Sequence, residues 1–193
     1  MRAMMDVIGR FWALMAVVFA FSAAIAGPAR ADSSQYTMQE IIDAGHGFFG
    51  STTGGLAKVV EQAFKRYGLP NGYILGQEGA GSFIIGATYG EGELYTKNAG
   101  QHTLFWQGPS IGLDYGGEGS RVMMLVYELP RVNAIYNRFG GLSGQAYVVA
   151  GFGMTVLKYG NVLIVPIRTG VGARLGVNVG YLKMTRKGTW NPF

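Results

Sequence analysis

Glycine at alternate positions of one apolar run restricts the fold of this chain more than any other feature. Residues 169–184 read TGVGARLGVNVGYLKM, and the apolar side chains alternate with Gly170, Gly172, Gly176 and Gly180. A period of two predicts a β-strand, because successive strand side chains point to opposite faces. Repeated glycine on one face indicates strong bending or the close approach of another element. A closed barrel or a helix-covered sheet meets both conditions.

Short alternating segments recur through most of the chain after residue 72. Glycine-rich or Asn-Gly-like links at 98–100, 116–119 and 160–161 suit hairpins, and short links favour antiparallel neighbours. We predict strands at residues 72–77, 82–89, 92–97, 101–107, 110–115, 121–128, 145–150, 154–159, 162–168 and 171–185. The predicted fold is mainly β: a small soluble antiparallel β-barrel of about ten strands with two or three short helices.

Three segments have helical periodicity. The clearest is 56–67, where apolar residues recur at helical spacing, residues 51–53 offer N-cap hydroxyls, and Gly68 ends the pattern. A second helix is predicted at 37–45, and a third at 130–139, between a proline and a glycine pair. We expect the apolar stripe of the 56–67 helix to pack on the sheet.

Two details of the strands predict where they lie. Residues 121–129 are apolar on both faces, so this strand is expected to be buried on both sides. Pro166 has no backbone N–H to donate to a neighbouring strand, which predicts an edge strand or a bulge there.

Residues 1–31 have the pattern of a secretory signal peptide. Two arginines precede an almost wholly apolar stretch at 11–26, and a small-x-small sequence suits cleavage after Ala31. The apolar stretch is shorter than the roughly 20 residues that span a bilayer. We therefore predict a cleaved signal peptide at 1–31 and a single β-barrel domain at 32–193, exported to the periplasm and not integral to a membrane.

Charge and composition limit the classes of function that the chain is expected to have. The chain has no cysteine, so an exported domain would depend on packing rather than on disulfides. The formal net charge of +5 falls to about +3 once the predicted leader is removed, and no block of like charge indicates a nucleic-acid site. Nucleic acid is therefore not an expected partner.

The sequence contains few residues suited to catalysis or metal binding. His46 and His102 lie in different predicted elements and there is no thiol, so a metal site is not expected. A Ser-His-Asp set could be drawn from Ser110, His102 and Asp114, but we give it no weight, and the glycine strings at 79–81 and 170–172 lack the third glycine of a nucleotide loop. We predict no enzymatic activity, no cofactor and no metal.

A cluster of basic residues is the candidate ligand-binding site. Arg168 and Arg174 are six residues apart and share one face if the strand continues between them. With Lys158 and Arg121, and with Lys183 nearby, they could bind an anionic head group. The alternative is that they are solvated charges on the outer face. The aromatic residues that suit either a wall for a lipid or sugar, or a barrel core, are Tyr89, Tyr95, Trp106 and Tyr115.

An outer-membrane β-barrel is the competing architecture. The leader, the alternating strands, the abundant aromatics and a terminal Phe193 suit it. Transmembrane strands need about 9 to 11 residues, however, and several segments here are shorter. Lys183, Arg186 and Lys187 also make a poor final strand for lipid contact, so we favour the soluble barrel.

Three stretches carry a resemblance to a known family: residues 45–50 (GHGFFG), 109–114 (PSIGLD) and 188–193 (GTWNPF). Through them the chain from Tyr36 to Phe193 resembles the envelope integrity protein A family of Alphaproteobacteria. The resemblance implies a periplasmic protein with a small soluble β-barrel, needed for the cell envelope, with no established enzymatic activity.

The second half of the chain, residues 109–184, is also similar to the SYLF lipid-binding domain. The glycine run at 170–180 and the turn at 151–153 carry this likeness, which implies binding of phosphoinositide lipids. SYLF proteins place a serine-rich segment before the last glycine strand, whereas this chain has VPIR at 165–168.

We therefore predict a non-enzymatic periplasmic protein that supports cell-envelope integrity by binding a lipid or an envelope polysaccharide intermediate. Two alternatives stay open: an interaction module that docks on another envelope protein, and an outer-membrane β-barrel. The expected partner is an envelope lipid, a polysaccharide or an envelope protein.

Overall fold

The computed structural model describes residues 34–50, 54–81, 86–110, 120–169, 180–189 and 191, all of which belong to one unit, Ser34–Phe193. The predicted signal peptide lies outside the described residues. So do most of the predicted strand at 110–115 and the glycine run at 170–179.

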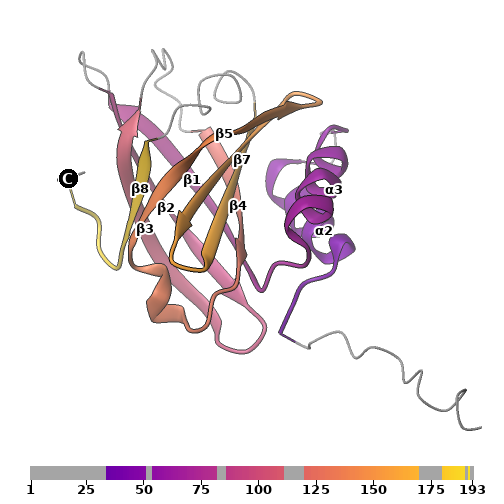
Figure 1. Cartoon of the computed structure of the whole chain (residues 1–193), viewed down its shortest axis with the longest axis horizontal. Helices are drawn as coiled ribbons and strands as arrows, with labels where there is room; N and C mark the ends of the chain where they lie inside the picture. Colours follow the sequence, from indigo (N-terminus) through magenta and orange to yellow (C-terminus); the bar gives the residue numbers. More distant parts are fainter. Residues whose placement is uncertain are drawn as a thin grey trace, which may run out of the picture. The chain divides into compact units, whose positions relative to one another are not determined.

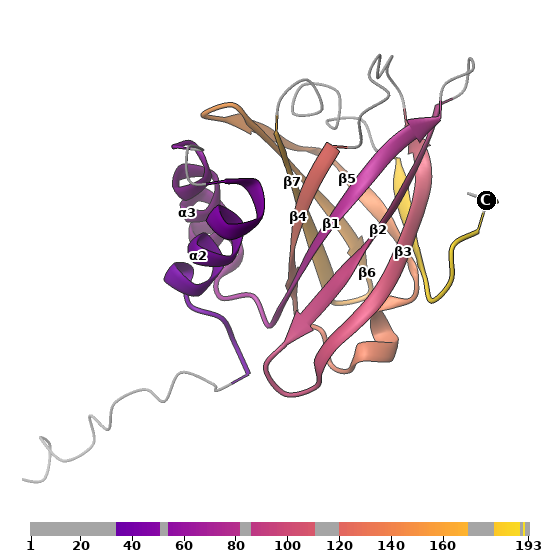
Figure 2. The same cartoon turned by 180° about the vertical axis from the view of Figure 1, so that it is seen from behind.

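Alternating side chains and tight glycine turns fold the described chain into a closed antiparallel barrel (Figures 1 and 2). The strands are β1 (Gly72–Gly81), β2 (Gly86–Thr96), β3 (Gly100–Ser110), β4 (Ser120–Tyr127), β5 (Arg138–Val149), β6 (Phe152–Tyr159), β7 (Val162–Thr169) and β8 (Tyr181–Thr185). Their order around the barrel is β1-β2-β3-β8-β5-β6-β7-β4. The predicted fold class is confirmed.

The described residues form eight strands where the sequence predicts about ten. Residues 86–89, the described part of the predicted segment 82–89, belong with the segment 92–97 to a single strand, β2, because Gly90 and Gly92 are paired with residues of both neighbouring strands. The predicted turns at 98–100 and 160–161 are present, and Gly100 and Gly160 have the positive φ that such turns require.

Among the described residues two helices precede the barrel, α2 (Met38–Phe49) and α3 (Leu56–Tyr67). The bounds of α3 and its end at Gly68 are confirmed, but its N-cap is Gly55 and not a residue of 51–53. Helix α2 continues through Gly45, where a Cβ atom would come within 2.6 Å of the Leu56 side chain, so glycine there lets α2 and α3 approach closely. In the described part of the chain no helix has the length and hydropathy needed to cross a membrane.

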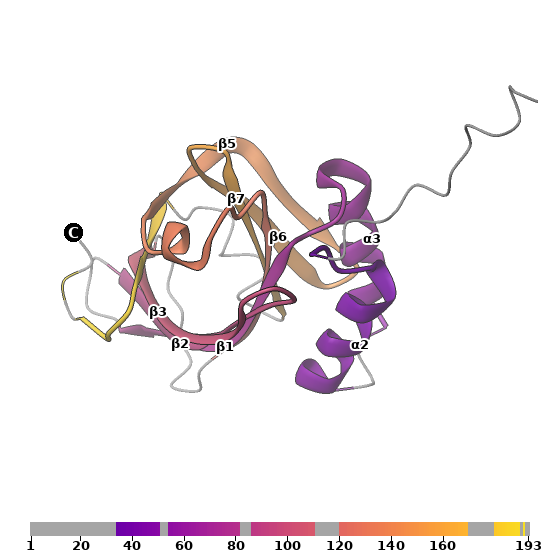
Figure 3. The same ribbon diagram turned by 90° about the horizontal axis from the view of Figure 1, so that it is seen from below.

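The predicted helix at 130–139 is wrong except for one short turn. A 3-10 helix, η1, spans Val132–Ile135, and the chain has already entered β5 at Arg138. Phe139 is buried as a strand residue opposite Leu182 rather than on a helix face. Seen from below in Figure 3, η1 lies across one end of the barrel, and side chains from 132–136 pack against the interior core. The helical spacing of the apolar residues here reflects this cap.

Strand β4 separates two hydrophobic clusters, as predicted for a strand that is apolar on both faces. Val122, Met124 and Val126 belong to the cluster inside the barrel. Met123 and Leu125 belong to the cluster outside it, which also contains the apolar stripe of α3. Because every one of these side chains is fully buried, β4 is the layer shared by both cores.

Pro166 lies in neither an edge strand nor a bulge, so that prediction is wrong. Strand β7 has β6 on one side and β4 on the other, and Pro166 is opposite Met124 in an unbroken register. The β6–β7 pairing instead skips Thr155 and Val156. Closure of the barrel removes the free edges, so the sheet accommodates the missing N–H by leaving out local pairs.

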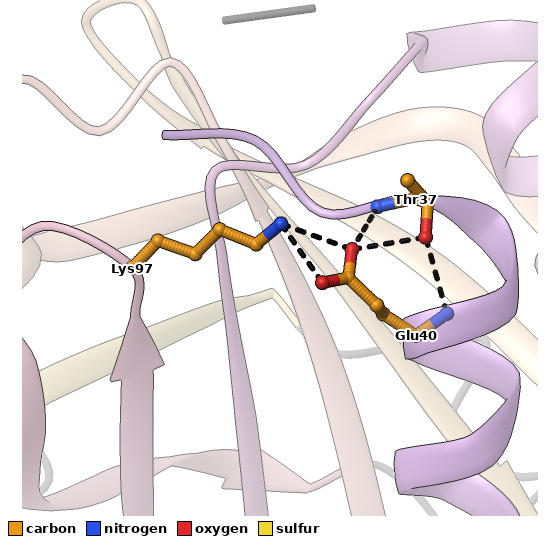
Figure 4. Close-up of polar contacts among 3 residues, drawn as sticks. All are labelled: Thr37, Glu40 and Lys97. Carbon is orange, nitrogen blue, oxygen red and sulfur yellow. Dashed lines mark hydrogen bonds and ion pairs between the residues drawn. The ribbon is translucent and has the colours of Figure 1, made fainter. Parts of the chain in front are cut away.

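A polar clamp joins the start of α2 to the β2–β3 turn (Figure 4). Thr37 and Glu40 form a reciprocal capping box, and the Lys97 ammonium lies 2.8 Å from Glu40 Oε1 and donates to Oε2 at 3.0 Å. The hydrogen bond from Lys97, together with those from Thr37, lowers the pKa of Glu40 to about 2.

Candidate functional site

The interior of the barrel is a packed core. Its strands contribute large apolar side chains that are at most 5 % exposed, among them Ile74, Leu94, Leu104, Trp106, Phe139, Leu157, Ile164 and Leu182. Small barrels of this strand number are usually filled by their own side chains. A site for a sizeable ligand therefore has to be sought on the outer wall.

Arg168, the first of the predicted ligand-binding residues, points into this interior and is paired there. It pairs opposite Val122, an inward-facing residue, and is 4 % exposed. Its Nε donates to Glu78 Oε1 and its Nη2 donates to Glu78 Oε2 at 3.1 Å. The Trp106 indole donates to the same Oε2 at 3.3 Å. The bidentate pairing compensates the charge of Arg168 inside the protein.

The other predicted basic residues do not join Arg168. Arg121 is exposed on the opposite face of the wall, where it donates to the Phe48 carbonyl at 2.7 Å and so contacts the end of α2. Lys158 is exposed on the outer face of β6, and Arg174 lies outside the described residues. The described members of the set therefore share no surface, and their role in ligand binding stays a prediction.

Two of the four predicted aromatic residues, Tyr89 and Trp106, line a hollow of about 480 Å³ on the wall formed by β1, β2 and β3. The C-terminal tail contributes Gly188 and Thr189 to its rim, and the tail runs outside the barrel, on the side away from α2 and α3 (Figures 1 and 3). The other lining residues are Gln77, Glu78, Gly79, Gly90, Glu91, Phe105 and Gln107. Tyr95 lies elsewhere, stacked on Tyr73, and Tyr115 is outside the described residues.

Glycines in this part of the wall make room for the Trp106 indole. A Cβ atom at Gly90 would lie 2.2 Å from the indole, and one at Gly76 would lie 2.6 Å from it. Both glycines are on the inward face, between side chains of the interior core. The indole therefore lies flat against bare backbone, and inward residues such as Trp106 and Glu78 reach the hollow where the wall carries no side chain.

Outward-facing residues supply the polar groups of the hollow. Gln77 and Glu91 are opposite each other on β1 and β2, and Tyr89 and Gln107 are opposite each other on β2 and β3. Gln107 is only 1 % exposed, and its Nε2 has no hydrogen-bond partner among the described residues. Tyr127 and Thr155 also have buried polar atoms that find no partner in the described part of the chain, but neither lines the hollow. A buried donor without a partner costs about 1–3 kcal/mol, which a ligand acceptor would recover.

Sequence reasoning missed Gln77, Glu91 and Gln107. Their only signal is that they are polar residues within β1, β2 and β3, which is also typical of any solvated outer face. No combination of His, Asp, Glu or Cys within the described ranges could hold a metal ion.

The fold and the hollow define a class: a small closed β-barrel with a packed interior, a helix pair on one side and a concave outer wall on another. The chain belongs to the envelope integrity protein A family, whose model matches residues 34–193. This membership supports a role in the integrity of the cell envelope.

A solved structure has the same fold. The crystal structure of a β-barrel-like, uncharacterized protein from Brucella abortus is 63% identical in sequence, with a TM-score of 0.79, and the match covers 83% of this chain and 99% of that chain. A comparison with curated proteins finds no match.

Proposed function

We propose that this protein is a non-enzymatic binding protein of the periplasm, exported by the leader at residues 1–31, and that it binds a saccharide of the cell envelope in the hollow beside the C-terminal tail. The observation that carries the proposal is the buried Gln107 Nε2, which has no hydrogen-bond partner among the described residues, in a concave site of about 480 Å³. Such a donor is matched by a hydroxyl or carbonyl oxygen of a ligand.

The chemistry of the hollow favours a sugar. Aromatic side chains at Tyr89 and Phe105 offer apolar surface for the C–H faces of a pyranose ring. Amides at Gln77 and Gln107 both donate and accept, and the Glu91 carboxylate accepts from hydroxyl groups. A site for a small ligand typically has a mostly apolar surface and a few polar groups that fix the orientation of the ligand.

An acyl chain is less well matched. The barrel interior, where a lipid tail would be held, is occupied by fully buried side chains. The similarity to the SYLF domain, with its phosphoinositide ligands, stays a prediction, and vesicle binding is therefore an outcome of the experiment below.

The distribution of polarity supports a protein that is not integral to the outer membrane. Membrane barrels face lipid with apolar side chains and usually have polar interiors. Here the interior cluster is apolar, while the outer faces of β2 and β3 carry Glu91, Glu93 and Thr103. Release of the protein by osmotic shock, without detergent, is the expected result of cell fractionation.

Two further observations favour binding over catalysis and over docking. Glu78, the buried carboxylate of the hollow, is already engaged by Arg168 and Trp106. The large apolar side chains that are exposed among the described residues are Leu69, in the link between α3 and β1, Val148 of β5 and Tyr159 of β6. In-cell crosslinking that yields a discrete protein adduct through these residues would favour a docking module instead.

Calorimetric titration with mannotriose, maltotriose and the trimer of N-acetylglucosamine tests the proposal. We expect binding to at least one, and a loss of about tenfold or more in Gln107→Leu, because each lost hydrogen bond to a matched ligand costs on this order. Gln101→Leu, an exposed glutamine on the same strand outside the hollow, is the matched control and should bind normally. Flotation with phosphatidylglycerol or phosphoinositide vesicles, combined with no sugar binding, would overturn the proposal.

A further inference from the structure

We propose that the hollow continues into a basic groove, and that the ligand is an anionic saccharide, one that carries carboxylate or phosphate groups. The inference rests on the proposed function, since it adds a charge-recognising part to the same site.

The groove lies next to the hollow and shares its rim. It has a volume of about 760 Å³, and Gly188 and Thr189 of the C-terminal tail line both spaces. Its charged lining residues are Arg138, Lys183, Arg186 and Lys187, and none of the described residues that line it is acidic. Arg138, Arg186 and Lys187, gathered in one concave surface, create a local positive potential that attracts anions.

One cross-strand row joins the two spaces. On the outer face Tyr89 is opposite Gln107, Gln107 is opposite Lys183, and Lys183 is opposite Arg138. Neighbouring strands are about 4.8 Å apart, so Gln107 and Arg138, two strands apart, are separated by about 10 Å along this row. An oligosaccharide that contacts Gln107 therefore reaches the arginine without crossing to another face.

The two arginines of the groove are oriented but not neutralised. The Arg138 guanidinium lies over the Tyr181 ring at 4.7 Å. That of Arg186 lies over Tyr136 at 4.4 Å and donates to Asn133 Oδ1 at 2.7 Å. Stacking on a ring restrains a guanidinium and leaves its edge donors in the plane available for an oxyanion. Within the described residues neither arginine forms an ion pair with a carboxylate, in contrast to Arg168.

The two ends of the site therefore differ in sign. Glu91 lies at the hollow, where the charge of Glu78 is compensated by Arg168, and the cations lie in the groove. Hydroxyl-rich sugar units suit the first end, and an acidic substituent suits the second, so the ligand has one favoured direction along the row.

A matched pair of probes tests this inference: trigalacturonate and its methyl-esterified form, which has the same rings without the charge. We expect the wild-type protein to bind the charged form about tenfold more tightly at low salt, and the preference to shrink at high salt because these groups are exposed to screening. Arg138→Gln/Arg186→Gln should bring the two affinities to within about twofold. Lys187→Gln, a milder change at an exposed position, should reduce the preference in part.

The control variant removes two positive charges from a surface outside the groove. Lys58→Gln/Lys65→Gln changes two exposed lysines of α3 and should keep the preference. Equal binding of both probes by the wild-type protein, abolished by Gln107→Leu, would overturn this inference and leave the proposed function standing. If the protein binds neither probe and none of the neutral trimers, both this inference and the proposed function are overturned. Arginine-dependent flotation with phosphatidylglycerol vesicles, without binding of trigalacturonate, would assign the groove to a lipid head group and overturn the inference.

Discussion

The two sides of this barrel are built differently. The covered wall, formed by β4, β6 and β7, is mainly apolar on both faces, because α2 and α3 pack on its outside (Figure 2). The bare wall, formed by β2, β3 and β8, is apolar only on its inner face, and its outer face carries polar side chains and the hollow. Water is excluded from the covered wall so completely that burial raises the pKa of the Tyr127 hydroxyl. The comparison indicates that one wall supplies stability and the other is available for binding.

The largest expected effect is a difference between the two walls in how much one substitution lowers the free energy of unfolding. Leu125→Ala removes a fully buried side chain beneath the helix pair and should lower the free energy of unfolding by about 2–5 kcal/mol. Thr103→Ala, on the exposed outer face of the bare wall, should change it by no more than about 0.5 kcal/mol. Urea denaturation followed by circular dichroism measures both. Similar small losses would mean that the helix pair contributes little to stability.

A smaller effect concerns the glycines of the bare wall. Gly90→Ala places a methyl group where the Trp106 ring already lies and should cost about 1–3 kcal/mol through overpacking, with a shift in tryptophan fluorescence. Gly79→Ala is the matched control, since a Cβ atom there meets nothing within 4 Å. If both substitutions are equally mild, the indole does not depend on bare backbone.

The smallest effect concerns the clamp that links α2 to the β2–β3 turn. The folded pKa of Glu40, about 2, lies below the unfolded value near 4.5, so its contribution is complete above the unfolded pKa and is lost as pH falls toward 2. The carboxylate is close to half exposed, so we expect less than about 1 kcal/mol. The difference in urea midpoint between wild type and Glu40→Gln should narrow from pH 6 to pH 2. A constant difference would show that the Lys97 contact contributes nothing.

Strong local patterns were read correctly from the sequence. The helix at 56–67 and the doubly apolar strand at 121–129 were predictable because each carries its own periodicity. The prediction of a helix at 130–139 was wrong although Val132, Ile135 and Phe139 have helical spacing. Val132 and Ile135 lie in the 3-10 helix that caps the barrel, and Phe139 lies in a strand. The prediction of an edge strand at Pro166 was wrong because the preference of proline for edge strands applies to an open sheet, whereas this sheet closes into a barrel.

The sequence by itself determined the all-β character, the helix that covers the sheet and the strand buried on both sides, because each depends on residues close together in the chain. Only the tertiary structure decided which charges are neutralised and which are presented. Arg168 is held by Glu78, ninety residues away, and Gln107 is aligned with Lys183 and Arg138 by strand register. Barrel closure brings such distant residues together, and no local pattern records which strands become neighbours.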